Sequence, residues 1–158
     1  MKKIDDLILK WLGYAIAALL FSMMVIIFVQ VLARYAFSNS LLWSEEAGRF
    51  HFVWITFFGL VVAYKKGAHV ALDLLPNYLT GINQKVLKLI NCLLIVALAA
   101  AFFTSGLELV ELGSGQESPA MELPMDLIYS VIPISGVLMF YFSVRELWNQ
   151  INTKAGDE

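Results

Sequence analysis

Long uncharged stretches dominate the sequence. Residues 11–33 form a run of 23 positions without one charged side chain, and shorter uncharged runs occupy 50–64, 89–107 and 127–144. A helix rises about 1.5 Å per residue, so about 20 apolar residues cover the hydrocarbon core of a bilayer, which is about 30 Å thick. Four such stretches in 158 residues leave little chain for a soluble domain. The sequence therefore predicts a membrane protein.

The composition favours helices over a β-barrel. Hydrophobic residues make up 59% of the chain and charged residues 15%. The apolar residues come in blocks, whereas barrel strands alternate in polarity. A helix satisfies its own backbone hydrogen bonds in lipid. We therefore predict an all-α integral membrane protein, a single domain over 1–158, with spans at about 11–33, 42–64, 89–107 and 127–144 and an interfacial amphipathic helix at about 75–88.

The second span needs residues before its uncharged run. Residues 50–64 would give a helix of only about 22 Å, so the helix is expected to start near Leu42. This start places Glu45, Glu46 and Arg49 in the first turns, where Arg49 is expected to neutralise one of the carboxylates. Charges at this depth usually face protein or water. Interfacial anchoring and a contact surface for another membrane protein both remain open.

Small residues and a proline affect the later spans. Ala97, Ala101 and Ser105 recur every four residues, and such a stripe lets helices approach closely.

Pro133 removes one backbone hydrogen bond from the fourth span, so a kink is expected there. The expected helix at 75–88 carries its apolar residues on one stripe, which suits docking on lipid or on a neighbouring subunit.

The distribution of basic residues predicts the orientation. Of the 11 lysines and arginines, Arg34 and Arg49 lie in the 34–49 connection and none lies in the 108–126 connection. The other nine lie in the two tails and the 65–88 connection. The positive-inside rule therefore predicts a multi-pass protein with both termini in the cytoplasm.

The 108–126 connection carries acids without a compensating cation. It is either a solvated loop or a contact for an extracytoplasmic partner with basic patches. The acids are Glu108, Glu111, Glu117, Glu122 and Asp126.

The spans contain little that could perform chemistry. Their polar residues include Gln30, His51 and Asn91, all near span ends. Haem anchors need histidines at matching depths on facing helices, and pumps need ionisable groups near the middle of the bilayer. The sequence also has no P-loop, dinucleotide-binding glycine pattern or CxxC motif. We expect no catalytic, substrate-binding or metal-binding residue, no cofactor and no enzyme activity. The net charge of −2 argues against a nucleic-acid partner.

Several short motifs resemble one transporter family. The segment from Gln30 to Tyr35, the Leu-Trp-Ser-Glu-Glu block ending at Glu46 and the following Arg49-Phe50 resemble the small membrane subunit of tripartite ATP-independent periplasmic (TRAP) transporters, the DctQ-like family. The His-Val-Ala-Leu-Asp block at 69–73 resembles the second signature of that family. The start of the fourth span, with Pro124-Met125, Tyr129 and Ile132-Pro133, is also similar.

The resemblance implies a role in a three-component uptake system of the bacterial inner membrane. A periplasmic binding protein captures an organic anion such as a C4-dicarboxylate or sialic acid, and a large multispan subunit moves it with sodium. The small subunit pairs with the large one as a scaffold and meets the binding protein. The positions that the resemblance assigns to assembly are Arg34, Trp43, Glu45, Glu46, Arg49, His69 and Asp73. The 108–126 acids are a candidate contact for the periplasmic protein.

Two other hypotheses stay open at this point. The chain could anchor a redox enzyme in the membrane, or it could be a small transporter that works alone as an oligomer. The transported anion is not predictable from this sequence, because the resemblance places selectivity in the other components.

Overall fold

Helices account for most of the described chain. The computed structural model describes residues 2–36, 41–74 and 82–152, with side chains for 3–36, 41–67 and 90–148. The helices are α1 (Lys2–Ala36), α2 (Leu42–Leu74), α3 (Ile82–Gly113), the short α4 (Met125–Tyr129) and α5 (Val131–Asn152). Four segments are long and apolar enough to cross a membrane: Lys3–Ala36, Leu42–Gly67, Ile90–Gly113 and Met125–Trp148. The predicted all-α fold with four spanning helices is confirmed.

The helices run past the predicted spans. The thickness of lipid limits the length of an apolar run, but a helix can continue into the interface, where long basic side chains reach water. α1 therefore begins at Lys2. α2 begins at Leu42, as predicted, and continues to Leu74.

The interfacial helix expected at 75–88 is described only in its second part. Residues 75–81 lie outside the described residues. Residues 82–88 belong to α3 and are continuous with the third spanning segment. No proline interrupts the sequence between Ile82 and Gly113, so the helix has no cause to break where the uncharged run begins.

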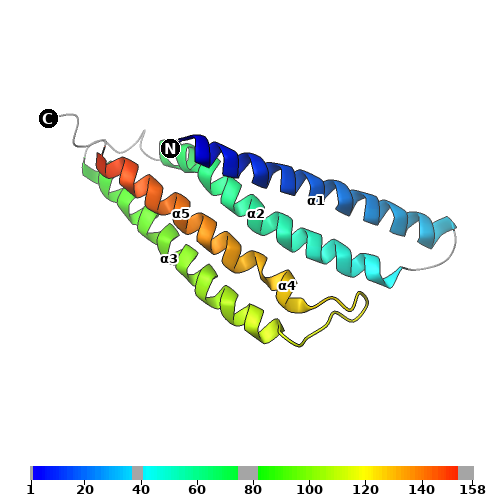
Figure 1. Ribbon diagram of the computed structural model, residues 1–158. Helices are drawn as coiled ribbons and strands as arrows, with labels where there is room; N and C mark the ends of the chain where they lie inside the picture. The colour runs from blue at the N-terminus through cyan, green and yellow to red at the C-terminus, as the bar shows by residue number, and fades with distance from the viewer. Residues whose placement is uncertain (1, 37–40, 75–81, 153–158) are drawn as a thin grey trace.

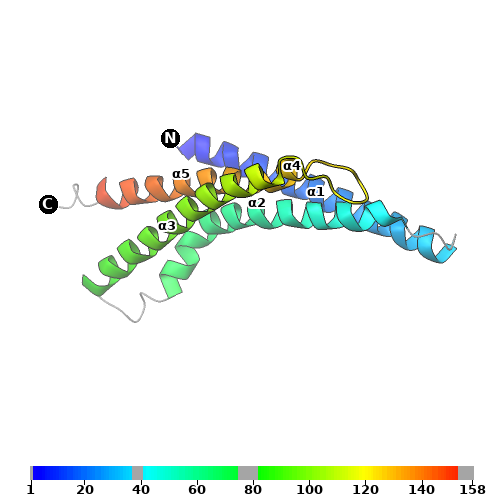
Figure 2. The ribbon, with the colours of Figure 1, turned by 90° about the horizontal axis from the view of Figure 1, so that it is seen from below.

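The spanning helices lie side by side in the order α1, α2, α5, α3 (Figure 1). α1 packs on α2, α2 on α5, and α5 on α3. The view turned by 90° shows α3 crossing α2 (Figure 2). The most apolar window of α1 contains no buried residue, whereas 44% of the corresponding window of the fourth span is buried. α1 therefore forms one edge of a layer, and most of its surface has no partner within the chain.

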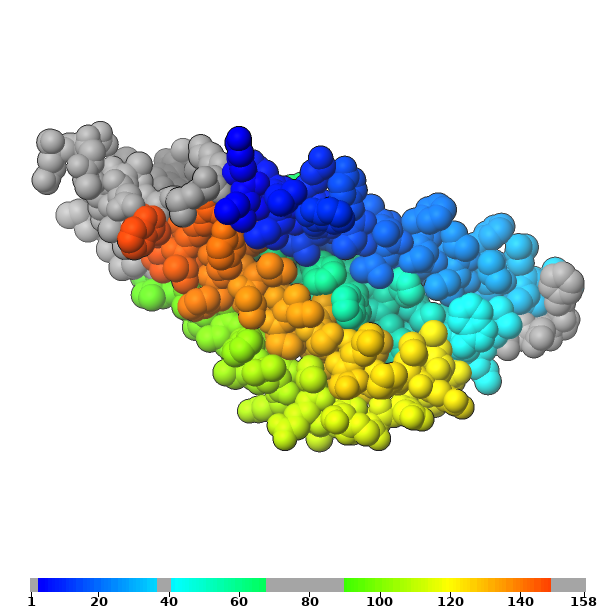
Figure 3. Space-filling view, viewed as in Figure 1, coloured from blue at the N-terminus to red at the C-terminus, as the bar shows by residue number. Residues whose placement is uncertain are grey.

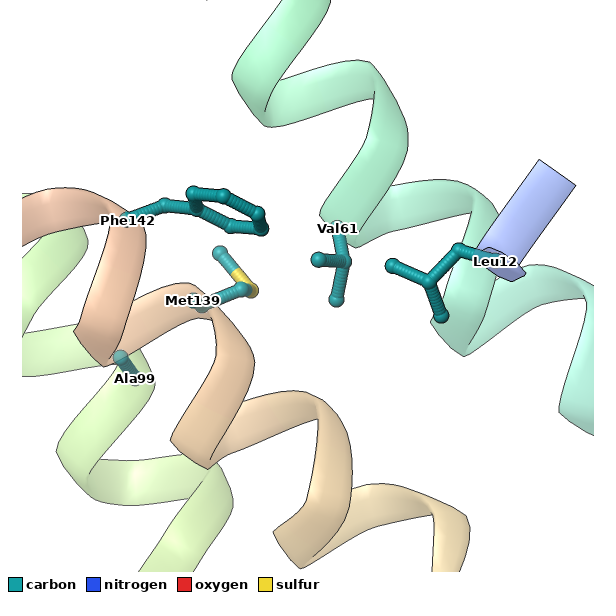
Figure 4. Packing of buried hydrophobic residues seen from close by; sticks show 5 residues of the cluster. All are labelled: Leu12, Val61, Ala99, Met139 and Phe142. Carbon is teal, nitrogen blue, oxygen red and sulfur yellow. The ribbon is translucent and has the colours of Figure 1, made fainter. Parts of the chain in front are cut away.

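The hydrophobic core lies where all four spans meet. Leu12 of α1, Val61 of α2, Ala99 of α3, and Met139 and Phe142 of α5 form a buried cluster (Figure 4). Phe142, Val61 and Met139 are at most 1% exposed. This cluster joins the α1–α2 pair to the α3–α5 pair.

Glycines allow α3 and α5 to approach closely. A Cβ atom added at Gly106 would lie 2.7 Å from Cδ of Pro133, and one added at Gly136 would lie 2.8 Å from the backbone nitrogen of Phe103. The small-residue stripe of Ala97 and Ala101 noted in the sequence is instead exposed. Close packing within this chain therefore uses a different face of α3.

The expected irregularity in the fourth span is present. The helix is interrupted at Ser130, between α4 and α5. A proline ring clashes with the carbonyl four residues earlier, and for Pro133 that carbonyl belongs to Tyr129, the last residue of α4. The interruption therefore lies one turn before the proline that causes it.

Candidate functional site

Glu46 occupies a buried position in the first turns of α2. The residue is 5% exposed. Its Oε2 atom accepts hydrogen bonds from the backbone N–H groups of Ala120 and Met121, at 3.1 and 3.0 Å. A carboxylate that leaves water needs such partners. The hydrogen bonds of Glu46 therefore connect the segment between α3 and α4 to the start of α2.

The segment that Glu46 holds is a compact turn, named here the 114–124 loop. Two backbone bonds close it: the N–H of Ser118 donates to the carbonyl of Leu123, and the N–H of Met125 donates to that of Gln116, both at 2.9 Å. Glu122, at φ 52°, adopts the left-handed conformation at its tip. In the space-filling view the loop lies against the start of α2 (Figure 3). We call this the loop end of the molecule.

The ion pair expected for Arg49 does not form. In the parts of the chain that the structure describes, no carboxylate lies within 4.0 Å of its guanidinium group. Glu46 is bonded to the loop instead, and Glu45 accepts a weak hydrogen bond from Nε2 of Gln30 at 3.5 Å. The spacing rule for i,i+3 and i,i+4 pairs describes an isolated helix. Here backbone N–H groups from a distant segment satisfy the buried carboxylate of Glu46, the i,i+3 neighbour of Arg49.

The seven residues suggested for assembly do not form one site. Arg34, Trp43, Glu45, Glu46 and Arg49 lie in the loop-end parts of α1 and α2, and all except Glu46 are exposed. His69 and Asp73 lie in the last turns of α2, where side chains are outside the described residues. The structure therefore places five residues of this set at the loop end and the other two, His69 and Asp73, in the last turns of α2.

The acids of the 108–126 connection line the loop end. Glu108 and Glu111 belong to the last turns of α3 and are exposed. Glu117 and Glu122 are exposed on the 114–124 loop. Asp126 is half-buried and accepts the N–H of Leu127 at 2.7 Å. Four of the five carboxylates are therefore exposed at the loop end.

A polar network at the opposite end was not predicted. We call this the terminal end, because α1 begins and α5 ends there (Figure 1). Asp5 of α1 forms an ion pair with Arg145 of α5 and accepts a hydrogen bond from the Tyr141 hydroxyl at 3.3 Å. Asp5 is only 8% exposed. This ion pair connects α1 to α5. The two helices have few other contacts with each other.

Further contacts at the terminal end join the remaining helices. Nζ of Lys65 lies 3.8 Å from Oε2 of Glu146. The Ser143 hydroxyl donates to the Tyr64 hydroxyl at 3.1 Å, and the Cys92 thiol donates to the Ser143 carbonyl at 3.6 Å. α2, α3 and α5 therefore share one polar cluster. The sequence does show that charged residues of this network lie at the edges of the apolar runs, but it does not show which residues pair with one another.

Asp5→Asn is expected to destabilise the folded protein by about 2 kcal/mol, because Arg145 would lose the charge that compensates it in a partly buried position. Unfolding of the purified protein in mixed micelles, with increasing sodium dodecyl sulfate, measures this change. Asp6→Asn is the matched control, because Asp6 is the exposed neighbour on the same helix. Equal stability of the two variants would mean that the ion pair contributes nothing.

Comparison with known proteins identifies the family. The family described as "Tripartite ATP-independent periplasmic transporters, DctQ component" matches residues 23–153. The chain belongs to the DctQ family. It is therefore a TRAP transporter small permease subunit and a multi-pass membrane protein. Its relatives are transporter subunits, so it is not an enzyme.

Individual relatives agree with this family membership. A TRAP transporter small permease protein of Haemophilus influenzae is 26% identical over 151 residues, which cover 96% of this chain and 94% of the relative. The isethionate TRAP transporter permease protein DctMQ of Oleidesulfovibrio alaskensis is 31% identical over 91% of this chain but 25% of its own length. The sialic acid TRAP transporter permease protein SiaT of Haemophilus influenzae is 28% identical over 93% of this chain and 23% of its own length. This DctQ-family chain thus corresponds to about a quarter of those two longer permeases.

Proposed function

We propose that this subunit is the scaffold of a sodium-coupled importer, in which it pairs with a large multispan subunit. The observation that carries the proposal is the unpartnered face of α1, whose most apolar window has no buried residue. The two longer permeases support pairing with a large subunit. In each of them about a quarter of the polypeptide matches this chain, and the much larger remainder belongs to the same polypeptide. The large subunit would cover the edge of the layer that α1 leaves open.

The two buried carboxylates support a scaffold more than a transport path. Asp5 and Glu46 are the buried acids among the residues whose side chains are described. Each lies at one end of the layer and is engaged within the chain, with Arg145 or with the 114–124 loop. Groups that bind and release a solute or an ion near the middle of the bilayer would need free polar atoms at that depth.

We further propose that the transported solute is an organic anion delivered by a periplasmic binding protein. The names of relatives include isethionate, sialic acid and C4-dicarboxylate, and each of these solutes carries an acidic group. The solute and sodium sites are assigned to the large subunit. The exposed acids at the loop end are the proposed contact for basic patches on the binding protein.

The proposed location is the bacterial inner membrane, with both termini in the cytoplasm. The excess of lysine and arginine in the tails and the 65–88 connection supports this orientation. The loop end then faces the periplasm. A cysteine introduced at Glu117 in a Cys92→Ala background should react with a membrane-impermeant thiol reagent on intact cells.

Assembly roles for the remaining motif residues are also proposals. Arg34 and Trp43 are exposed at the loop end, so they can contact the large subunit directly. Glu46 would act through the 114–124 loop that it holds. His69 and Asp73 would act at the other end of α2.

Reconstitution tests the proposed function. We expect this chain to co-purify with a large membrane subunit, and sodium-driven uptake into liposomes to require both subunits and a periplasmic binding protein. Radiolabelled succinate, sialic acid and isethionate are the probes. Uptake by this chain alone would overturn the scaffold assignment, and bound haem in the visible absorption spectrum would favour a redox anchor.

A further inference from the structure

An open groove separates α1 from α2 near the loop end. Met23 and Ile27 of α1 and Phe52 and Val53 of α2 make its apolar floor. Gly48 contributes to its hollow shape, since a Cβ atom added there would meet nothing within 4 Å. Ile27 and Phe52 are 41% and 62% exposed, so the groove is open on the outer surface of this chain. A flexible hydrocarbon chain fits such a surface.

The rim of this groove carries hydrogen-bonding groups of both kinds. Gln30, Glu45 and Arg49 line it where the helices approach the loop end. Nε2 of Gln30 donates to Oε1 of Glu45, which leaves the Gln30 carbonyl oxygen and the second Glu45 oxygen as acceptors. Arg49 forms no ion pair with any carboxylate whose position is described. Its guanidinium group can donate several hydrogen bonds to an anion.

The spacing of the rim charges suits a zwitterion. Glu45 and Arg49 are four residues apart on α2, so they lie on one face with Cβ atoms about 6 Å apart. Glu46, the other acid nearby, is already bonded to the 114–124 loop. A ligand with one phosphate and one ammonium group would satisfy both exposed charges without leaving a net charge at the membrane interface.

We propose that this groove binds phosphatidylethanolamine. The phosphate accepts hydrogen bonds from Arg49, the primary ammonium donates to Glu45 and Gln30, and one acyl chain lies along the apolar floor. The ammonium has three N–H donors for the two acceptors at the rim. The bound lipid fills the space between α1 and α2, and α2 is the helix on which α1 mainly packs.

The same chemistry separates phosphatidylethanolamine from other phospholipids. Phosphatidylcholine carries a quaternary ammonium, which has no N–H to donate. Phosphatidylglycerol has no cation, so Glu45 would face a second negative charge across the rim. Arg49 alone would favour any phospholipid, so the preference depends on Glu45 and Gln30.

Native mass spectrometry of the full chain in detergent tests the proposal. Phosphatidylethanolamine, phosphatidylglycerol and phosphatidylcholine with identical acyl chains are added separately. We expect phosphatidylethanolamine to bind about fivefold more tightly than either of the others. Glu45→Gln should remove the preference for the ethanolamine head group, and Arg49→Gln should weaken binding of all three lipids.

Two variants at the terminal end serve as matched controls. Asp6→Asn and Lys66→Gln remove an exposed acid from α1 and an exposed cation from α2, away from the groove. Both should keep the lipid preference of the unmodified chain. Equal binding of the three lipids, or an unchanged preference in Glu45→Gln, would overturn the proposal. So would a Phe52→Cys variant that cross-links to the large subunit while showing no lipid preference, because the groove would then hold a protein helix. Failure of the uptake experiment leaves this result unaffected.

Discussion

Gly136→Ala is expected to destabilise the protein by about 2 kcal/mol, within the range typical of overpacked cores. The added Cβ atom would lie 2.8 Å from the backbone nitrogen of Phe103 and 3.0 Å from the carbonyl oxygen of Ala99. Backbone atoms of α3 cannot rotate away as a side chain can, so α3 and α5 must move apart. Unfolding by sodium dodecyl sulfate in mixed micelles measures the loss.

Gly59→Ala is the control for that substitution. Gly59 lies within α2, and a Cβ atom added there would meet nothing within 4 Å. Alanine is more favourable than glycine inside a helix by up to about 1 kcal/mol, so this variant should be as stable as the parent or more stable. A similar change in both variants would show that close packing of α3 on α5 is not the reason for the glycine.

Glu46→Ala is expected to release the 114–124 loop and to weaken co-purification with the large subunit. The N–H groups of Ala120 and Met121 lose their acceptor, so their hydrogen exchange should become roughly tenfold faster. Exchange measured by mass spectrometry reports on the loop, and the yield of large subunit in a detergent pull-down reports on assembly. Glu46→Gln keeps one acceptor oxygen but no charge, so it should give an intermediate result.

Glu45→Ala separates the effect of the loop contact from the effect of charge. Glu45 is the neighbouring acid but is exposed and makes no bond to the loop. Loop exchange should therefore stay as in the parent. If Glu46→Ala also leaves exchange and co-purification unchanged, the carboxylate is an interfacial anchor without a role in assembly.

The helices were predictable because lipid permits few alternatives. Uncharged runs of sufficient length must be helical there, and the short uncharged run at 50–64 correctly implied that α2 starts near Leu42. Helix ends were less predictable, because a helix can continue into the interface. α3, for example, starts at Ile82, before the run that marks its apolar part.

The side-chain contacts were mostly not predictable. The partners of Glu46 are backbone N–H groups, which carry no signature in the sequence. Asp5 and Arg145 are 140 positions apart, so no rule of local spacing could pair them. The local spacing rule suggested a direct ion pair for Arg49, but Glu46 is hydrogen-bonded to the 114–124 loop, and the charge of Arg49 acts on it only from a distance.

The layered order of the helices determines where the molecule is mechanically weakest. α1 with α2 and α3 with α5 form two hairpins, and α2–α5 is the least extensive of the three interfaces between neighbouring spans. Few other contacts cross from one hairpin to the other, chiefly the Asp5–Arg145 ion pair and the bonds of Glu46 to the 114–124 loop. A pulling force applied to α1 therefore reaches α3 through the α2–α5 seam and these few polar contacts. Under tension the subunit would come apart as two intact hairpins rather than helix by helix.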